Sequence, residues 1–118
     1  MADTAIPNTT LVLNTSTAQP AGTAIVAANT HVITPTKEMS KLIVRLNNTF
    51  VGSKDFTILA GDNPPADAAG QGNLVIALTQ DATVLVPLES ARFVQNDGTV
   101  RISVAAATTG FISAIQLP

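Results

Sequence analysis

The amino-acid sequence predicts an all-β fold, a single-domain antiparallel β-sandwich of jelly-roll or Ig-like type with about 8–10 short strands. Short runs in which apolar and polar residues alternate recur along the chain, as in strands with one buried face. Turn-forming Gly, Pro, Asn and Asp residues separate these runs at intervals of about 8–12 residues. Helical character is confined to residues 35–40, so the βαβ units of a parallel sheet are not expected.

The most regular strand signal lies in residues 99–104, TVRISV. Its valines and its isoleucine share one face, and its Thr, Arg and Ser share the other. The preceding Asn96, Asp97 and Gly98 favour the positive φ angles of a tight turn. We therefore expect a hairpin in which residues 92–95 pair with residues 99–104, with Gly98 at positive φ.

The remaining chain divides into further strands and their connections. Residues 1–8 contain Pro7 among small residues, and we expect them to form an extended N-terminal arm. Residues 61–72, GDNPPADAAGQG, contain two prolines and three glycines and are expected to form a long surface loop. The other expected strands are Thr9–Asn14, Thr23–Ala27, Thr30–Thr34, Lys41–Asn47, Lys54–Ala60, Asn73–Thr79, Thr83–Leu88 and Phe111–Leu117. Alternation assigns to the core Leu42, Val44, Leu46, Phe56, Ile58, Phe93, Val100, Ile102 and Val104.

Composition narrows the classes of partner. A chain of 118 residues without cysteine fits one domain that folds without disulfides. The net charge of −2 and the scattered Lys and Arg residues argue against a nucleic-acid partner. The first residues do not resemble a signal peptide, and no apolar run approaches the about 20 residues of a membrane helix, so no membrane partner is expected. Charged residues make up only 12% of the chain, against about 25% in ordinary soluble domains. Two explanations stay open: a surface rich in Thr, Ser and Asn, or a surface covered by partners.

No group of residues predicts catalysis or cofactor binding. His31 is the sole histidine, has no nucleophile motif near it, and is expected to be a structural or surface residue without a defined partner. Asp62 and Asp67 lack the glutamate that closes an EF-hand, and no cysteine offers a thiolate, so no metal site is expected. The absence of Trp and Tyr removes the stacking surfaces of a sugar or single-strand nucleic-acid site. We therefore expect a protein that is not an enzyme, with no cofactor and no small-molecule substrate.

Four segments resemble a known type of protein. They are AGDNPPA at residues 60–66, GNLVIAL at residues 72–78, VPLESARFVQNDGTVRISV at residues 86–104, and TGFISAIQLP at residues 109–118. Together they resemble small virion structural proteins of tailed bacteriophages, of the head decoration or capsid cement type. The resemblance covers roughly residues 41–118, and its most specific part is the PLESARFVQ run followed by Asp97 and Gly98.

The resemblance implies a function without catalytic residues. It implies an all-β domain present as a homo-oligomer or in many copies on a shell, with the major capsid protein as partner. Such a protein would be made in the bacterial host cytoplasm and would reside on the capsid surface of the virion. The alternative is an Ig-like β domain of a tail or fibre that attaches to a host surface. Candidate contacts with the capsid or a neighbouring subunit are Ile6, Pro7, Leu11, Val12, Leu13, Pro64 and Pro65.

Overall fold

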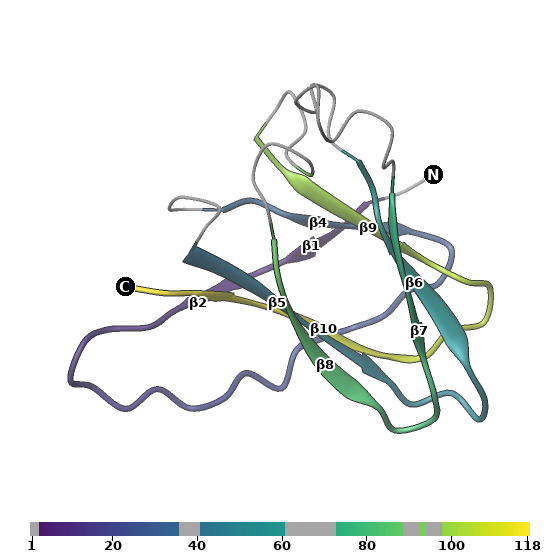
Figure 1. Cartoon of the computed structure of the whole chain (residues 1–118), viewed down its shortest axis with the longest axis horizontal. Helices are drawn as coiled ribbons and strands as arrows, with labels where there is room; N and C mark the ends of the chain where they lie inside the picture. Colours follow the sequence, from purple (N-terminus) through teal and green to yellow (C-terminus); the bar gives the residue numbers. More distant parts are fainter. Residues whose placement is uncertain (1–2, 36–40, 61–72, 89–92, 94–97) are drawn as a thin grey trace.

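The protein is a β-sandwich of two packed sheets, here called sheet A and sheet B (Figure 1). The computed structural model describes residues 3–35, 41–60, 73–88, 93 and 98–118 of the chain. Sheet A has the strand order β1-β4-β9-β6-β7, and sheet B has the order β2-β10-β5-β8, with β3 also paired to β10. The predicted all-β sandwich is therefore confirmed.

The described strands match most of the predicted runs. In sheet A they are β1 (Asp3–Ile6), β4 (Thr30–Ile33), β6 (Lys54–Ile58), β7 (Leu74–Leu78) and β9 (Val100–Val104). In sheet B they are β2 (Asn8–Thr10), β3 (Thr23–Ala24), β5 (Leu42–Asn48), β8 (Thr83–Pro87) and β10 (Gly110–Gln116). The strand β2 ends at Thr10, earlier than the predicted Thr9–Asn14 run, although the Leu11 N–H still donates to the Gln116 carbonyl of β10. Residues 36–40 and the predicted loop at residues 61–72 lie outside the described residues.

Both sheets are mixed rather than purely antiparallel. The N-terminal strands β1 and β2 run parallel to β4 and β10, whereas the other strand pairs are antiparallel. The last two strands, β9 and β10, lie in different sheets. In the Ig arrangement the last two strands are neighbours in one sheet, so the Ig-like strand order is not the one observed.

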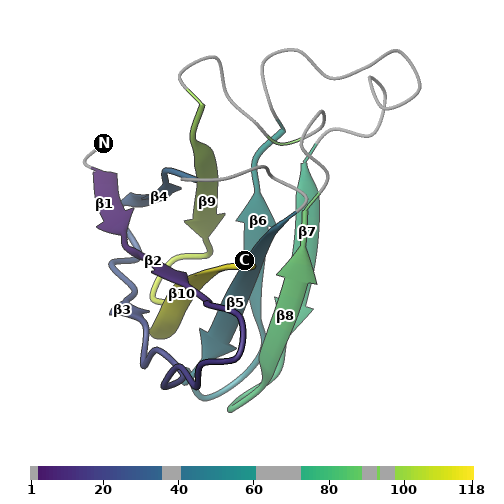
Figure 2. The same cartoon turned by 90° about the vertical axis from the view of Figure 1, so that its left-hand side faces the viewer.

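The N-terminal segment is part of the sandwich, so the predicted free arm is wrong for residues 3–8. Asp3 to Ile6 pair with Thr30 to Ile33, and Asn8 to Thr10 pair with Ala114 to Gln116. Pro7, which has no backbone N–H to donate, lies where the chain passes from sheet A to sheet B. Figure 2 shows β1 passing into β2 on one side of the sandwich, with β7 and β8 on the opposite side. Each N-terminal strand therefore covers an edge that would otherwise be open.

The core lies between the sheets and follows the predicted alternation. In β5 the residues Leu42, Val44 and Leu46 are fully buried, while the intervening residues are half-buried on the outer face. All the predicted core residues are buried except Val104, which is half-buried and packs against the cluster. The buried hydrophobic residues are Ile6, Ile33, Leu42, Val44, Leu46, Phe56, Ile58, Leu78, Leu88, Phe93, Val100, Ile102, Ile112 and Ala114.

The predicted positive φ of Gly98 is confirmed, whereas the predicted partner strand of the hairpin, residues 92–95, lies outside the described residues except for Phe93. Gly98 has φ of 82°, in the left-handed region that favours glycine. However, β9 pairs with β4 on one edge and with β6 on the other, and the Arg101 carbonyl also accepts a hydrogen bond from the Leu59 N–H. The described partners of β9 are therefore strands that are distant in the sequence. Residues 94–97, which include the rest of that turn, lie outside the described residues.

Candidate interaction surface

The outer face of sheet B is the candidate functional surface, and we call it face B. Because directly opposite residues of paired strands lie on one face, the register of β5 with β10 and β8 defines its members. Three rows cross it, with Arg45 in the middle row between Ser113 of β10 and Leu85 of β8. Its described members are Ile43, Arg45, Asn47, Thr83, Leu85, Pro87, Phe111, Ser113 and Ile115.

Face B carries more apolar than polar side chains and has no acidic residue among these positions. Leu85 is 59% exposed and Phe111 is 39% exposed, and exposed apolar side chains that share one face can mark an interaction site. Ile43 and Ile115 are half-buried beside them. The outer face of sheet A is more polar, since it carries Asp55 on β6 and the ion pair described next. The two faces of the sandwich therefore differ in character.

Arg45 and Arg101 are both outward-facing arginines of strands with neighbours on both sides, but their surroundings differ. On the sheet A side, Arg101 Nη1 lies 3.2 Å from Asp3 Oδ2. On face B, the Nε and Nη1 atoms of Arg45 are buried and donate to no acceptor in the part of the chain that the structure describes. A charged donor that is shielded from water and lacks an acceptor is strongly unfavourable. Arg45 thus presents unmet hydrogen-bonding capacity at the centre of an apolar face.

Ser113 adds a second unmet polar group beside Arg45. It is directly opposite Arg45 in the β5–β10 ladder, is 2% exposed, and its Oγ has no hydrogen-bond partner among the described residues. Gly22 lies over it, because a Cβ atom at Gly22 would stand 2.7 Å from Ser113 Oγ and 2.9 Å from Phe111 Cβ. The segment that leads into β3 therefore covers Ser113. A guanidinium and a hydroxyl on adjacent strands form an arrangement that suits a carboxylate.

His31 is a buried structural residue and is not part of face B. Its Nε2 accepts a hydrogen bond from the Val26 N–H at 3.1 Å, and its Nδ1 lies 3.4 Å from the Ile102 carbonyl oxygen. These partners fit a neutral ring with its proton on Nδ1. The expectation that this imidazole has no defined partner is wrong, because β4 places it inside the sandwich, where its exposed fraction is 0%.

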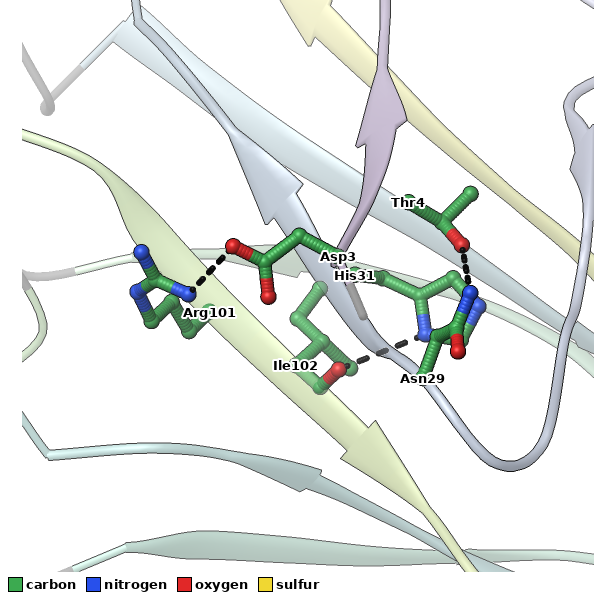
Figure 3. A network of polar contacts seen from close by, with 6 residues as sticks. All are labelled: Asp3, Thr4, Asn29, His31, Arg101 and Ile102. Carbon is green, nitrogen blue, oxygen red and sulfur yellow. Dashed lines mark hydrogen bonds and ion pairs between the residues drawn. The ribbon is translucent and has the colours of Figure 1, made fainter. Parts of the chain in front are cut away.

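The surroundings of His31 also hold the N-terminal strand in place (Figure 3). Asn29 Nδ2 donates to Thr4 Oγ1 at 2.9 Å, and the Arg101–Asp3 ion pair spans from β9 to β1 across β4. Burial lowers the pKa of His31 below 6.5, although the hydrogen bond with the Ile102 carbonyl opposes this shift. Protonation of His31 therefore opposes folding.

The predicted contact residues are dispersed rather than gathered. Ile6 is only 4% exposed and belongs to the core, so its assignment to an interface is wrong; pairing of β1 with β4 turns it inward. Pro7 is exposed and Leu11 is half-buried. Val12 and Leu13, just beyond β2, are 58% and 71% exposed and remain available for contact. Pro64 and Pro65 lie outside the described residues.

The residues that distinguish face B are not recognisable in the sequence alone. Arg45, Leu85 and Ser113 each look like ordinary strand residues, and only the register brings them together. The alternation of the Lys41–Asn47 run indicated only that the Arg45 side chain faces away from the core. No family model, curated protein or solved structure matches the chain.

The described residues offer little else that binds a ligand. They contain no group of three or more His, Asp and Glu side chains that could hold a metal ion. No pocket is found in the described part of the chain. No helix in this part is long and apolar enough to cross a membrane. Face B is therefore the surface on which a functional proposal can be built.

Proposed function

We propose that the chain is a non-enzymatic virion structural protein, a head decoration or cement protein that binds and stabilises the major capsid protein shell of a tailed bacteriophage. On this proposal it is made in the host cytoplasm and lies in many copies on the capsid surface. The observation that carries the proposal is face B, a sheet face with exposed Leu85 and Phe111 on a chain in which only 12% of residues are charged. The sequence resemblance to decoration proteins points in the same direction.

The shape of the domain supports this function. A cement protein needs a compact body with a broad apolar face that excludes water from a joint between shell subunits. The sandwich has principal extents of 40 × 35 × 24 Å, and its two outer faces differ in polarity. A polar outer face of sheet A would remain in solvent while face B lies on the shell. Val12 and Leu13 add apolar surface near the end of β2.

The test is the location of the chain in purified virions. We expect an epitope-tagged chain, imaged by immunogold electron microscopy, to label the whole head and to be released together with shell fragments. A matched particle without the tag is the control for antibody specificity. Labelling confined to the tail would replace this proposal with the tail or fibre alternative. Absence of the chain from washed particles would refute both.

A further inference from the structure

We propose that face B recognises a carboxylate, an Asp or Glu side chain flanked by apolar residues on a different protein, which displaces the segment that covers Ser113 and pairs with Arg45 and Ser113. If the proposed function is correct, the partner is the major capsid protein of the shell. Only this identity of the partner rests on the proposed function. The preference for a carboxylate rests on the hydrogen-bonding state of the two residues.

Arg45 and Ser113 both carry buried polar atoms without a hydrogen-bond partner among the described residues. These atoms are Nε and Nη1 of Arg45 and Oγ of Ser113, and the two residues are directly opposite each other on adjacent strands. Buried donors are normally satisfied, because each unsatisfied one disfavours the folded state. A carboxylate has two oxygens that accept several hydrogen bonds, and it matches the planar guanidinium. An incoming carboxylate would therefore satisfy donors that the free domain leaves unpaired.

Arg101, in a similar position on sheet A, is paired with a carboxylate. Arg101 also faces outward from a strand with neighbours on both sides, and the carboxylate of Asp3 accepts from its Nη1 at 3.2 Å. Sheet B contains no equivalent acid at the positions that flank Arg45, which are occupied by Leu85 and Ser113. Charge complementarity thus assigns the acid to the partner.

The charge of Arg45 excludes a second copy docked face to face. In a two-fold contact of face B with itself, the two Arg45 side chains would approach each other near the axis, and like charges repel. The described positions of face B provide no acid to separate them. The occupant must therefore present a different surface, with its own acidic residue.

The apolar surroundings define the rest of the motif. Phe111 lies in the row on one side of Arg45, and Ile43 and Ile115 lie in the row on the other side, so residues beside the acid should be apolar. In an extended segment, residues two positions from the acid lie on the same face, at about 6.6–6.8 Å from it. A segment with the pattern apolar-x-acid-x-apolar therefore fits the surface.

The test uses a blocked peptide of sequence SLTETLS and a matched peptide, SLTQTLS, in which only the carboxylate is changed to an amide. Binding is followed by the backbone amide NMR signals of the full chain. We expect SLTETLS to shift the signals of β5, β8 and β10. The affinity of SLTQTLS should be lower by a factor of at least about ten. Equal binding of the two peptides, no binding of SLTETLS, or shifts that map to sheet A would each overturn the proposal.

Two variants locate the effect. Arg45→Leu should abolish the preference for SLTETLS, whereas Arg101→Gln, a matched change on the opposite face, should leave it unchanged. Chemical denaturation of the same proteins gives a second measurement. Arg45→Leu removes buried unpaired donors, so its unfolding midpoint should lie at or above that of the wild type, while Arg101→Gln should lower the midpoint slightly because it breaks an ion pair. A lower midpoint for Arg45→Leu would show that Arg45 has a partner within the domain and would overturn the proposal.

Other occupants give distinct results. Sodium acetate or phosphate that reproduces the SLTETLS shifts at equal concentration would indicate an adventitious ion only. Concentration-dependent association of the wild type that is lost in Arg45→Leu would make the occupant a second copy. Either result would overturn the proposal of a carboxylate-bearing partner protein. Absence of the chain from virions, by contrast, would refute the proposed function and leave the peptide preference intact.

Discussion

Asn48 at the end of β5 provides the sharpest test of how the sandwich is held together. Its side chain has an exposed fraction of 0% and makes four hydrogen bonds to the backbone of two connections. Nδ2 lies 3.0 Å from the Gly52 carbonyl, 2.9 Å from the Leu78 carbonyl and 3.2 Å from the Thr79 carbonyl. Oδ1 accepts from the Phe50 N–H at 3.0 Å. One amide therefore joins the β5–β6 turn to the β7–β8 turn.

We expect Asn48→Leu to reduce the free energy of unfolding by about 3–5 kcal/mol. The leucine is similar in volume, so the loss comes chiefly from backbone groups left without their partner. Each buried group left unpaired disfavours the folded state by about 1–3 kcal/mol. At about 1.5 kcal/mol each, the Leu78 carbonyl and the Phe50 N–H give the lower end of the range, about 3 kcal/mol, and the other two carbonyls, which share the Nδ2 protons, extend it to about 5 kcal/mol.

The assay is urea denaturation followed by far-UV circular dichroism, with the slope compared between variants to check that unfolding remains two-state. Asn47→Leu is the matched control, because this neighbour faces outward and its Nδ2 donates to Thr83 Oγ1 at an exposed site. We expect the control to lose less than about 1 kcal/mol. A loss below about 1 kcal/mol for Asn48→Leu, or equal losses for the two variants, would refute the assigned role of Asn48.

Three further predictions concern the core, the histidine and the segment over face B. Ile102→Ala should reduce the free energy of unfolding by about 2–5 kcal/mol, because Ile102 is fully buried between the sheets; a loss below about 0.5 kcal/mol in urea denaturation would contradict this packing. The pKa of His31 in the folded state lies below 6.5. The neutral ring therefore contributes its full stabilisation above pH 6.5, and this contribution is lost as the pH falls from 6.5 toward the folded-state pKa. When the pH is lowered from about 7.5 to 5.5, the melting temperature of the wild type should therefore fall more than that of His31→Gln. Equal falls in the two proteins would contradict the assignment of His31 as a buried neutral imidazole. Gly22→Ala should destabilise the domain by more than about 1 kcal/mol, because φ is +98° and the new Cβ would clash with Ser113 Oγ; an unchanged melting temperature would show that the segment does not lie over β10.

Local alternation was enough to predict most strands and the core. In residues 42–48 every second side chain is buried, so period-two patterning identified both the strand and its inward face. The tight turn at Gly98 was equally local, since positive φ depends on the glycine itself. The strand partners of β9 could not be predicted in this way because pairing is not local: Arg101 and its neighbours pair with β4 and β6, which lie far away in the sequence.

The N-terminal strands and face B needed the fold before they could be recognised. Residues 3–8 contain Pro7 and little alternation, so composition alone suggested an arm, and the parallel pairing of β1 with β4 and of β2 with β10 is not visible in the local sequence. Gln116 is polar yet fully buried, with its Nε2 bonded to the Lys41 carbonyl, which obscured the inward face of β10. Arg45 looked like an ordinary surface arginine until the register placed Leu85 and Ser113 beside it.

A cryo-electron microscopy map of the virion at side-chain resolution would test the proposed role of face B most directly. We expect the domain on the head lattice with Leu85 and Phe111 covered by the shell protein. We also expect an Asp or Glu of that protein within hydrogen-bond distance of the Arg45 guanidinium. A domain bound through the outer face of sheet A, with face B open to solvent and Arg45 still unpaired, would contradict it.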